Sequence, residues 1–207
     1  MSVVVAGCKV NLGLRITGLR DNGYHELDSL FWPLPRPYDT LHINETGTNG
    51  IVVHCDTPGI DLGRNTLTRA YAALAEIVPN LPGLEVELIK GIPAGAGLGG
   101  GSSDAAALLL WLNKRLPAPL TDEELATVAL KVGADTPFFL KNTPCRVRGI
   151  GEIIEPCGPD ELAGIRLVLV CSNIHASTPQ AYADYDAAMQ ASNTIPGQNC
   201  LTKPESK

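Results

Sequence analysis

The 207-residue sequence lacks several features that would assign it to a familiar class at once. Its six cysteines include no C-x-x-C pair, which argues against a structural zinc site or a disulfide framework and favours free thiols in a reducing compartment. No run approaches the ~18 apolar residues of a membrane helix. The opening MSVVVAGC has no basic segment and too short an apolar stretch for a signal peptide. We therefore expect a cytoplasmic protein.

Basic charge is also scarce. The formal net charge is −6, so the chain has no overall positive field, and neither nucleic acid nor a membrane is an expected partner. The hydrophobic share of 44% and the charged share of 18% are those of an ordinary globular protein. The length suffices for one domain, or for one domain and part of a second. Phosphate chemistry must therefore depend on backbone N–H groups and individual basic side chains.

The first half of the chain is rich in expected strands. Alternating or β-branched runs up to about residue 55 predict several short strands, with a turn centred on Asn22–Gly23. Helical spacing of apolar residues predicts a helix over 65–78. Alternation returns over 84–90, which predicts a strand that leads into a glycine-rich run.

The second half predicts more helix. A strong helical pattern follows the glycine-rich run, and Thr121 with Glu124 forms a capping box at the start of another helix. A hairpin is expected to turn at 149–151, and the apolar run 165–171 predicts a buried strand. A further helix begins near Pro179. Mixed strands and helices in this order indicate an α+β layered domain.

Residues 93–106, PAGAGLGGGSSDAA, form the most distinctive segment. Glycines directly before a helix let several backbone N–H groups converge on phosphate oxygens, and the helix N-terminus adds positive potential. Ser102 and Ser103 add hydroxyls that can bind phosphate or Mg²⁺. Asp104 can serve as a charge partner at the helix start or lie close to the metal. The segment therefore predicts a cradle for a triphosphate.

Three other interpretations of the run compete with a phosphate cradle. Gly95, Gly97 and Gly100 satisfy the dinucleotide pattern G-x-G-x-x-G, but that fold needs an acidic residue about 20 positions later, after a second strand, where this chain has the loop RLPAPLTDEE. A Walker loop needs Gly-Lys-Ser/Thr, and the run contains no lysine. A glycine loop without chemical role remains open, although glycine costs about 1 kcal/mol relative to alanine in a helix.

Several segments together resemble the GHMP kinase superfamily, which includes galactokinase, homoserine kinase and mevalonate kinase. PAGAGLGGGSSDAA resembles its second motif, the loop that wraps the ATP phosphates. The form with three glycines and two serines is closest to members whose acceptor is a cytidine-diphosphate-linked methylerythritol. KVNLGLRITGLRDNGYHELDSLF, GADTPFF and STPQAY resemble other segments of those kinases, in the same order, and the matches run from about residue 3 to residue 186.

The resemblance implies a fold and an activity. The fold is α+β, the GHMP-kinase N-terminal domain of the ribosomal protein S5 domain 2-like type. The activity is ATP-dependent phosphorylation of the 2-hydroxyl of 4-diphosphocytidyl-2-C-methyl-D-erythritol in non-mevalonate isoprenoid precursor biosynthesis, with ATP and Mg²⁺. Residues 1–160 would form the N-terminal ATP-binding and catalytic domain, 161–191 the start of a C-terminal domain, and 192–207 a disordered tail.

The resemblance also implies roles for individual residues. Asp135 would be the base that takes the acceptor's proton, and Lys9, which lies among apolar neighbours and needs a partner carboxylate such as Asp135, would be the second catalytic residue. The ATP-binding residues would be Pro93, Ala94, Gly95, Ala96, Gly97, Leu98, Gly99, Gly100, Gly101, Ser102, Ser103 and Asn65, with Ser103 also a candidate Mg²⁺ contact. The substrate-binding residues would be Asn11, Tyr24, His25 and Tyr182, with Tyr24 and His25 at the cytosine and Tyr182 on its other side.

One departure from the superfamily leaves alternatives open. A third glycine-rich motif, of the Ser-Gly-Ser-Gly or Thr-Gly-Thr-Gly kind, has no counterpart after Cys171, where the only glycine is Gly197. We expect a shortened C-terminal domain and an uncovered apolar face that favours self-association. The alternatives are a GHMP kinase for another small alcohol, and a non-catalytic protein that binds nucleotide without turnover.

Overall fold

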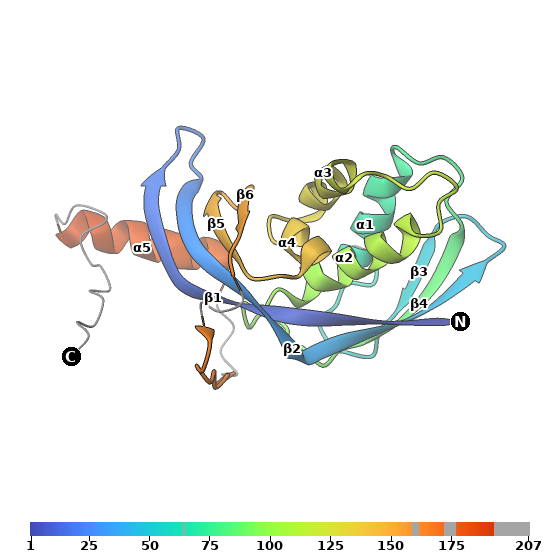
Figure 1. Ribbon diagram of the computed structural model, residues 1–207, viewed down its shortest axis with the longest axis horizontal. Coiled ribbons are helices and arrows are strands. Elements are labelled where there is room, and N and C mark those ends of the chain that lie inside the picture. The colour runs from blue at the N-terminus through green and yellow to red at the C-terminus, as the bar shows by residue number, and fades with distance from the viewer. Residues whose placement is uncertain (64, 159–161, 172–176, 193–207) are drawn as a thin grey trace.

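The helices between residues 66 and 141 gather on one side of a single twisted sheet, and the last helix of the described chain lies apart from them (Figure 1). The computed structural model describes residues 1–63, 65–158, 162–171 and 177–192. The strands are β1 (Ser2–Leu19), β2 (His25–Thr46), β3 (Ile51–His54), β4 (Gly83–Ile89), β5 (Cys145–Gly149) and β6 (Ile153–Pro156). The helices are α1 (Thr66–Ala75), α2 (Gly100–Asn113), α3 (Asp122–Val132), α4 (Thr136–Lys141) and α5 (Thr178–Ser192).

The long strand β2 organises the sheet. It pairs antiparallel with β1 along nearly its whole length, with β4 at one end and with β5 at the other. The order is β3-β4-β2-β5-β6, with β1 beside β2, and only β3 and β4 run parallel. Because β1 and β2 cross most of the molecule (Figure 1), residues from both ends of the sheet share one frame.

Helix α2 is the centre of the core. Eight of its fourteen residues are buried, because it packs against the sheet on one side and against α1, α3 and α4 on the others. No side of this helix is broadly exposed to solvent, and for this reason Ala and Leu residues follow one another in its sequence without polar interruptions. The fully buried large apolar side chains include Leu41, Ile43, Leu67, Leu74, Leu84, Leu108, Leu109 and Leu112. The helix that follows the glycine-rich run is therefore fixed on all sides.

Most elements predicted from the pattern are present. The helices expected over 65–78, after the glycine run and after Pro179 correspond to α1, α2 and α5, and the predicted capping box of α3 is formed. The hairpin at 149–151 is formed by β5 and β6. The expectation of several short strands before residue 55 was wrong in number, since two long strands absorb most of them. The six-residue helix α4 was not predicted.

The prediction of a buried strand over 165–171 was wrong. This segment has no strand assignment, and Val168 and Val170 are 86% and 85% exposed. An apolar run is buried only where another layer covers it, and no described element does so. The expected tail, 192–207, lies outside the described residues except for its first position. Within the described part of the chain, no helix has the length and apolar character needed to cross a membrane.

Candidate active site

The glycine-rich run forms a loop that bends three times in the left-handed region. Gly95, Gly97 and Gly99 have φ values of 73°, 73° and 74°, which glycine adopts without strain. Gly99 is the N-cap of α2. A methyl group at Gly99 would come within 2.8 Å of the Phe139 ring and 3.2 Å of Lys9 Cε. The end of the loop is therefore in close contact with two side chains from distant parts of the sequence.

A cavity of about 320 Å³ lies along the loop. Residues 93–101 line it together with Asn65, Thr66, Lys90 and Asp104. Asn65 caps α1 by accepting hydrogen bonds from the N–H groups of the two residues Leu67 and Thr68. The cavity thus lies at the N-termini of α1 and α2, where unpaired N–H groups and the helix dipoles favour an anion. All the predicted ATP-binding residues except two serines line this cavity.

The two serines lie elsewhere. Ser103 is 4% exposed and lines a different hollow, between α2, α4 and the start of β1. Its hydroxyl is therefore not brought to the cavity as the sequence led us to expect, because the helix turns it towards the sheet. Ser102 is half-buried. No group of three acidic, histidine or cysteine side chains that could hold a metal ion is found in the described residues.

Lys9 and Asp135 form an ion pair beside the loop, as expected from the sequence. Lys9 Nζ lies 3.3 Å from Asp135 Oδ2 and donates to the carbonyl of Gly97 at 3.1 Å and to Asn11 Oδ1. It also lies 4.8 Å above the centre of the Phe31 ring, a favourable cation–π position. The ammonium is almost fully buried, so these contacts fix its place. Asn11 faces the same way because it is two residues along the strand.

Local structure explains why the Asp135 carboxylate is accessible. Helix α3 ends at Gly133, and Asp135 occupies the N-cap position of α4, where Pro137 follows in the first turn. Its carboxylate makes no capping bond to the helix and is 35% exposed. The side chain therefore keeps lone pairs available on the open side while Lys9 holds one oxygen. A carboxylate in this position can accept a proton from a nearby hydroxyl.

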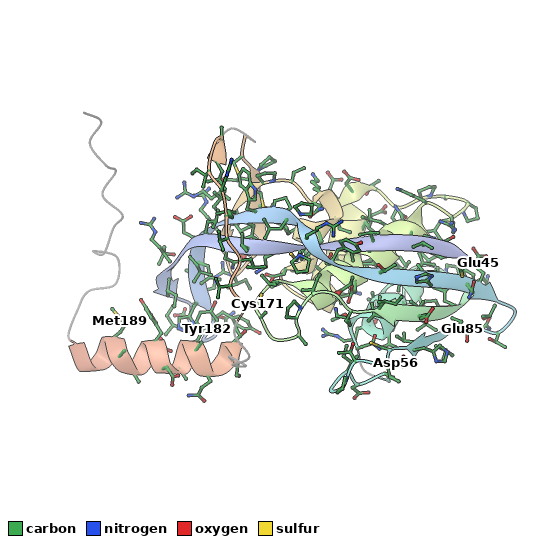
Figure 2. All side chains as sticks on the ribbon, turned by 90° about the horizontal axis from the view of Figure 1, so that it is seen from below. Glu45, Asp56, Glu85, Cys171, Tyr182 and Met189 are labelled. Carbon is green, nitrogen blue, oxygen red and sulfur yellow. The ribbon has the colours of Figure 1, made fainter. Side chains whose placement is uncertain are left out.

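Aromatic side chains from β2 and α5 meet near this pair. The His25 and Tyr182 rings stack with centroids 4.6 Å apart and an interplanar angle of 11°, and Tyr185 contacts His25 edge-on. His25 Nε2 lies 2.8 Å from Asp186 Oδ1. Burial raises the pKa of Tyr182, and the negative charge of Asp135 adds to the shift. Figure 2 shows Tyr182 on the side of α5 that faces the body of the protein.

The predicted substrate residues are only partly brought together. His25 and Tyr182 are adjacent, but their rings stack on each other, so a base does not lie between them in this arrangement. Tyr24 is 60% exposed, beyond the turn, and makes none of these ring contacts. The end of the site with His25 and Tyr182, where the sequence predicts the acceptor, is therefore covered by the chain's own side chains, whereas the cavity along the glycine loop, where the sequence predicts the nucleotide, is open.

Sequence reasoning missed a buried charge cluster at the nucleotide end. Lys90 donates to Asp39 and, at 2.9 Å, to Asp104, and all three side chains are at most 9% exposed. Burial raises the pKa of Asp104 to about 7, against the opposing effect of Lys90. Asp104 Oδ1 has no hydrogen-bond partner among the described residues. Lys90 could have been noticed, since it directly follows the strand before the loop; Asp39 carries no local signal.

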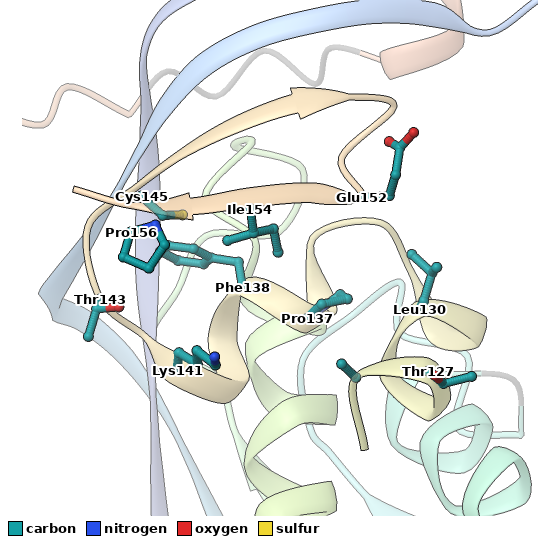
Figure 3. A pocket seen from close by; sticks show the side chains of 11 residues that line it. Thr127, Leu130, Pro137, Phe138, Lys141, Thr143, Cys145, Glu152, Ile154 and Pro156 are labelled. Atoms are coloured by element: carbon teal, nitrogen blue, oxygen red, sulfur yellow. The ribbon is translucent and has the colours of Figure 1, made fainter. Parts of the chain in front are cut away.

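A second cavity, of about 330 Å³, lies between α3, α4 and the β5–β6 hairpin (Figure 3). Its lining is mostly apolar, with Lys141 and Glu152 at opposite ends. Burial raises the pKa of the Cys145 thiol to about 12, so this cysteine stays protonated and is a poor nucleophile. We find no reactive pair in this cavity comparable to Lys9 and Asp135.

The sequence is similar to a known family and to known kinases. The family model "GHMP kinases N terminal domain" matches residues 65–142. The chain is similar to the 4-diphosphocytidyl-2-C-methyl-D-erythritol kinase of Lawsonia intracellularis, with 48% identity over 186 residues, which cover 88% of this chain and 61% of that one. It is 50% identical over 197 residues to the kinase of the same name from Nitratidesulfovibrio vulgaris, covering 95% and 68%.

A solved structure shares the fold. The crystal structure of a 4-(cytidine 5'-diphospho)-2C-methyl-D-erythritol kinase matches with a TM-score of 0.63 and 38% identity, covering 75% of this chain and 55% of the other. The chain therefore spans 61% of the length of the first of the two relatives and 55% of this structure.

Proposed function

The chain belongs to the GHMP kinases, and from this premise we propose that it transfers the γ-phosphate of ATP to the 2-hydroxyl of 4-diphosphocytidyl-2-C-methyl-D-erythritol. The products are the 2-phosphate and ADP, in the non-mevalonate route to isoprenoid precursors. The observation that carries the proposal is the Lys9–Asp135 pair, at 3.3 Å, directly beside the phosphate-binding loop. The names of the relatives support the choice of acceptor.

The proposed reaction needs positioning and charge more than covalent chemistry. The N–H groups of the glycine loop and the N-terminus of α2 hold the triphosphate. Asp135 takes the proton of the acceptor hydroxyl, and the Lys9 ammonium stabilises the negative charge that develops on that oxygen. A bond forms between this oxygen and the γ-phosphorus, the bond to the β-bridging oxygen breaks, and ADP leaves.

Mg²⁺ fits the site as a companion of ATP. The described residues offer no cluster of three ligands, which suits an ion held mainly by phosphate oxygens and water. Bound there, it would neutralise charge on the β- and γ-phosphates. Two carboxylates are near the expected place of the ion. Asp104 lines the cavity and has an oxygen without a hydrogen-bond partner among the described residues, and Asp135 is the other.

Product analysis tests the proposal. The purified chain is given ATP, Mg²⁺ and the acceptor, and ³¹P NMR identifies the phosphorylated position; we expect a new phosphomonoester at the 2-hydroxyl. Competition by cytidine diphosphate, compared with uridine diphosphate, tests the acceptor class. Equal inhibition by both, with turnover of another small alcohol, would favour a different GHMP kinase. Nucleotide binding without turnover would favour the non-catalytic alternative.

We also propose that the chain associates with itself through residues 165–170. Ile165, Leu167, Val168, Leu169 and Val170 are exposed in this segment, and an apolar patch of this kind favours association. Light scattering after size exclusion should give a mass above 21.9 kDa that falls when Val168 and Val170 are changed to lysine. A monomer at all concentrations would contradict this.

A further inference from the structure

One buried carboxylate lies where the two ends of the phosphate-binding loop meet. The backbone N–H groups of Gly91 and Ile92, at the loop's beginning, donate to Asp39 Oδ1 at 2.7 and 2.8 Å. At the loop's end, a methyl group placed on Gly100 would come within 3.3 Å of Asp39 Oδ2. Asp39 belongs to β2, fifty residues before the loop, so this contact is not a consequence of the loop's own sequence.

The charge of Asp39 is compensated at the same place. Lys90 Nζ, from the residue just before the loop, donates to Asp39 Oδ2 and also to Asp104 in the first turns of α2. Asp39 is 0% exposed, and a buried carboxylate persists only where hydrogen bonds and an opposite charge satisfy it. The Asp39 carboxylate is therefore hydrogen-bonded to the beginning of the loop and to Lys90, and Lys90 links it to Asp104 in α2, just after the loop.

We propose that Asp39 is a positioning residue for the phosphate-binding loop: it holds the two ends of the loop together in the shape that receives the nucleotide phosphates. This inference rests on the proposed function, since it assumes that the loop binds ATP. Asp39 does not touch the ligand, because it lies beneath the cavity without solvent contact. It raises affinity by keeping the loop in its binding shape before the nucleotide arrives.

A plain fold-stabilising role is the competing explanation, and it predicts a different pattern. If Asp39 only stabilised the sheet, its loss would loosen the protein generally and weaken all ligands alike. If Asp39 shapes the loop, its loss should loosen residues 91–101 and leave the rest of the protein unchanged. It should also weaken the binding of a ligand more strongly the more phosphates that ligand carries. Asp28 provides the matched control: it is also on β2, largely buried, and bound to Arg15 and Arg146, but lies away from the loop.

Hydrogen exchange without nucleotide is the first test. In Asp39→Ala, we expect the amides of residues 91–101 to exchange at least about tenfold faster, because two carboxylate-bound amides lose their acceptor, while β5 and β6 are unchanged. Asp28→Asn should leave the loop protected. Unchanged loop exchange in a folded Asp39→Ala protein would overturn the inference, and this result does not depend on whether ATP binds.

Nucleotide affinity is the second test, measured by titration calorimetry with ATP and AMP. Asp39→Ala should weaken ATP binding about tenfold or more and AMP binding less than about threefold, since a loop that is only fractionally formed lowers apparent affinity by that fraction. Asp39→Asn keeps an acceptor for both amides and should recover most of the ATP affinity. Equal losses for ATP and AMP would overturn the inference. Wild-type protein that does not bind ATP would instead refute the proposed function, leaving hydrogen exchange to decide the role of Asp39.

Discussion

The nucleotide end and the acceptor end of the site are built in different ways. The nucleotide end comes mainly from one stretch, residues 90–104, and contains an open cavity of about 320 Å³. The acceptor end combines β2, the start of α4 and α5, which are far apart in the sequence, and the His25 and Tyr182 rings close on each other there. The cavity at the nucleotide end exists before a ligand binds, whereas the rings at the acceptor end would have to separate to admit one.

This difference suggests how the two ligands bind. The glycine loop is held by Lys9, Asp39 and Phe139, so ATP meets a shape that already exists. In the proposed function, the acceptor's base would have to separate His25 from Tyr182, or shift the helix that carries Tyr182, before it could stack between them. We therefore expect changes at the nucleotide end to alter stability and ATP affinity together. Changes at the acceptor end should alter acceptor affinity alone.

The largest effect is expected where the two ends meet. Lys9→Met removes the ammonium that contacts Asp135 and the Gly97 carbonyl, and should lower kcat by about 10²–10⁴, the usual range for a catalytic group. Steady-state kinetics with both substrates measures this. Lys131→Met, which removes an exposed ion pair with Glu76, should change kcat less than about twofold because surface pairs contribute little. Comparable losses in the two variants would mean that Lys9 has no special role.

The rigidity of the nucleotide end is tested at Gly99. Gly99→Ala forces alanine into the left-handed region and against the Phe139 ring, and should lower the free energy of unfolding by about 2–4 kcal/mol. Gly13→Ala has a similar φ, 63°, but meets nothing within 4 Å, and should cost about 1 kcal/mol. Urea unfolding compares them. Equal losses would show that the contact with Phe139 does not constrain the loop.

The acceptor end is tested at Tyr182. Tyr182→Ala removes a ring on which a base can stack, and should raise KM for the acceptor about 3–10-fold, given ~0.5–1.5 kcal/mol for an aromatic pair. KM for ATP should stay within about twofold, because none of the described α5 residues lines the cavity along the loop. A parallel rise in both KM values would contradict the separation of the two ends.

A further prediction concerns how the free energy of unfolding depends on pH. The folded-state pKa of Asp104 is raised from 3.8 to about 7, so the protein binds more protons at this site than the unfolded chain does, and stability falls as pH rises from about 4 to 7. Asp104→Asn should flatten this part of the curve, measured by urea unfolding at each pH. A curve unchanged by the substitution would contradict the assignment.

Asp28 should change how stability depends on pH in the acidic range. Hydrogen bonds from Arg146, opposed by burial, lower its pKa from 3.8 to about 2. Its contribution to stability is therefore present above about pH 4 and lost as pH falls towards 2. Asp28→Asn should lower the free energy of unfolding by a constant amount above about pH 4 and remove the slope below it. A change of slope between pH 5 and 7 in Asp28→Asn would mean that the two carboxylates are coupled.

The sequence predicted the nucleotide end better than the acceptor end, for a physical reason. A phosphate loop is a local structure: its glycines, the strand before it and the helix after it all lie within thirty residues, and each has its own pattern. The pairing of Lys9 with Asp135 was also predictable, because a buried lysine needs a carboxylate. The direction in which the Ser103 side chain points, by contrast, depends on the rotation of α2 about its own axis relative to the sheet, which the local sequence does not specify.

The missed features depend on contacts between distant segments. Asp39 is an ordinary strand residue until β2 and β4 align and bring it to Gly91. The stacking of Tyr182 on His25 depends on where α5 lies relative to β2, which no periodicity specifies. The exposure of 165–171 has the same origin: the run has the composition of a buried strand, but burial is a property of the surrounding layers.

The central claim is that Lys9 and Asp135 act as one catalytic unit, and a double-mutant cycle on acceptor-dependent ADP release tests it most directly. The wild-type chain, Lys9→Met, Asp135→Asn and the double variant are compared with ATP, Mg²⁺ and 4-diphosphocytidyl-2-C-methyl-D-erythritol. The account predicts turnover in the wild type, with losses of about 10²–10⁴ in each single variant and little further loss in the double variant, because residues that act together are not additive. Losses that multiply, or a folded Asp135→Asn protein that retains full turnover, would contradict it.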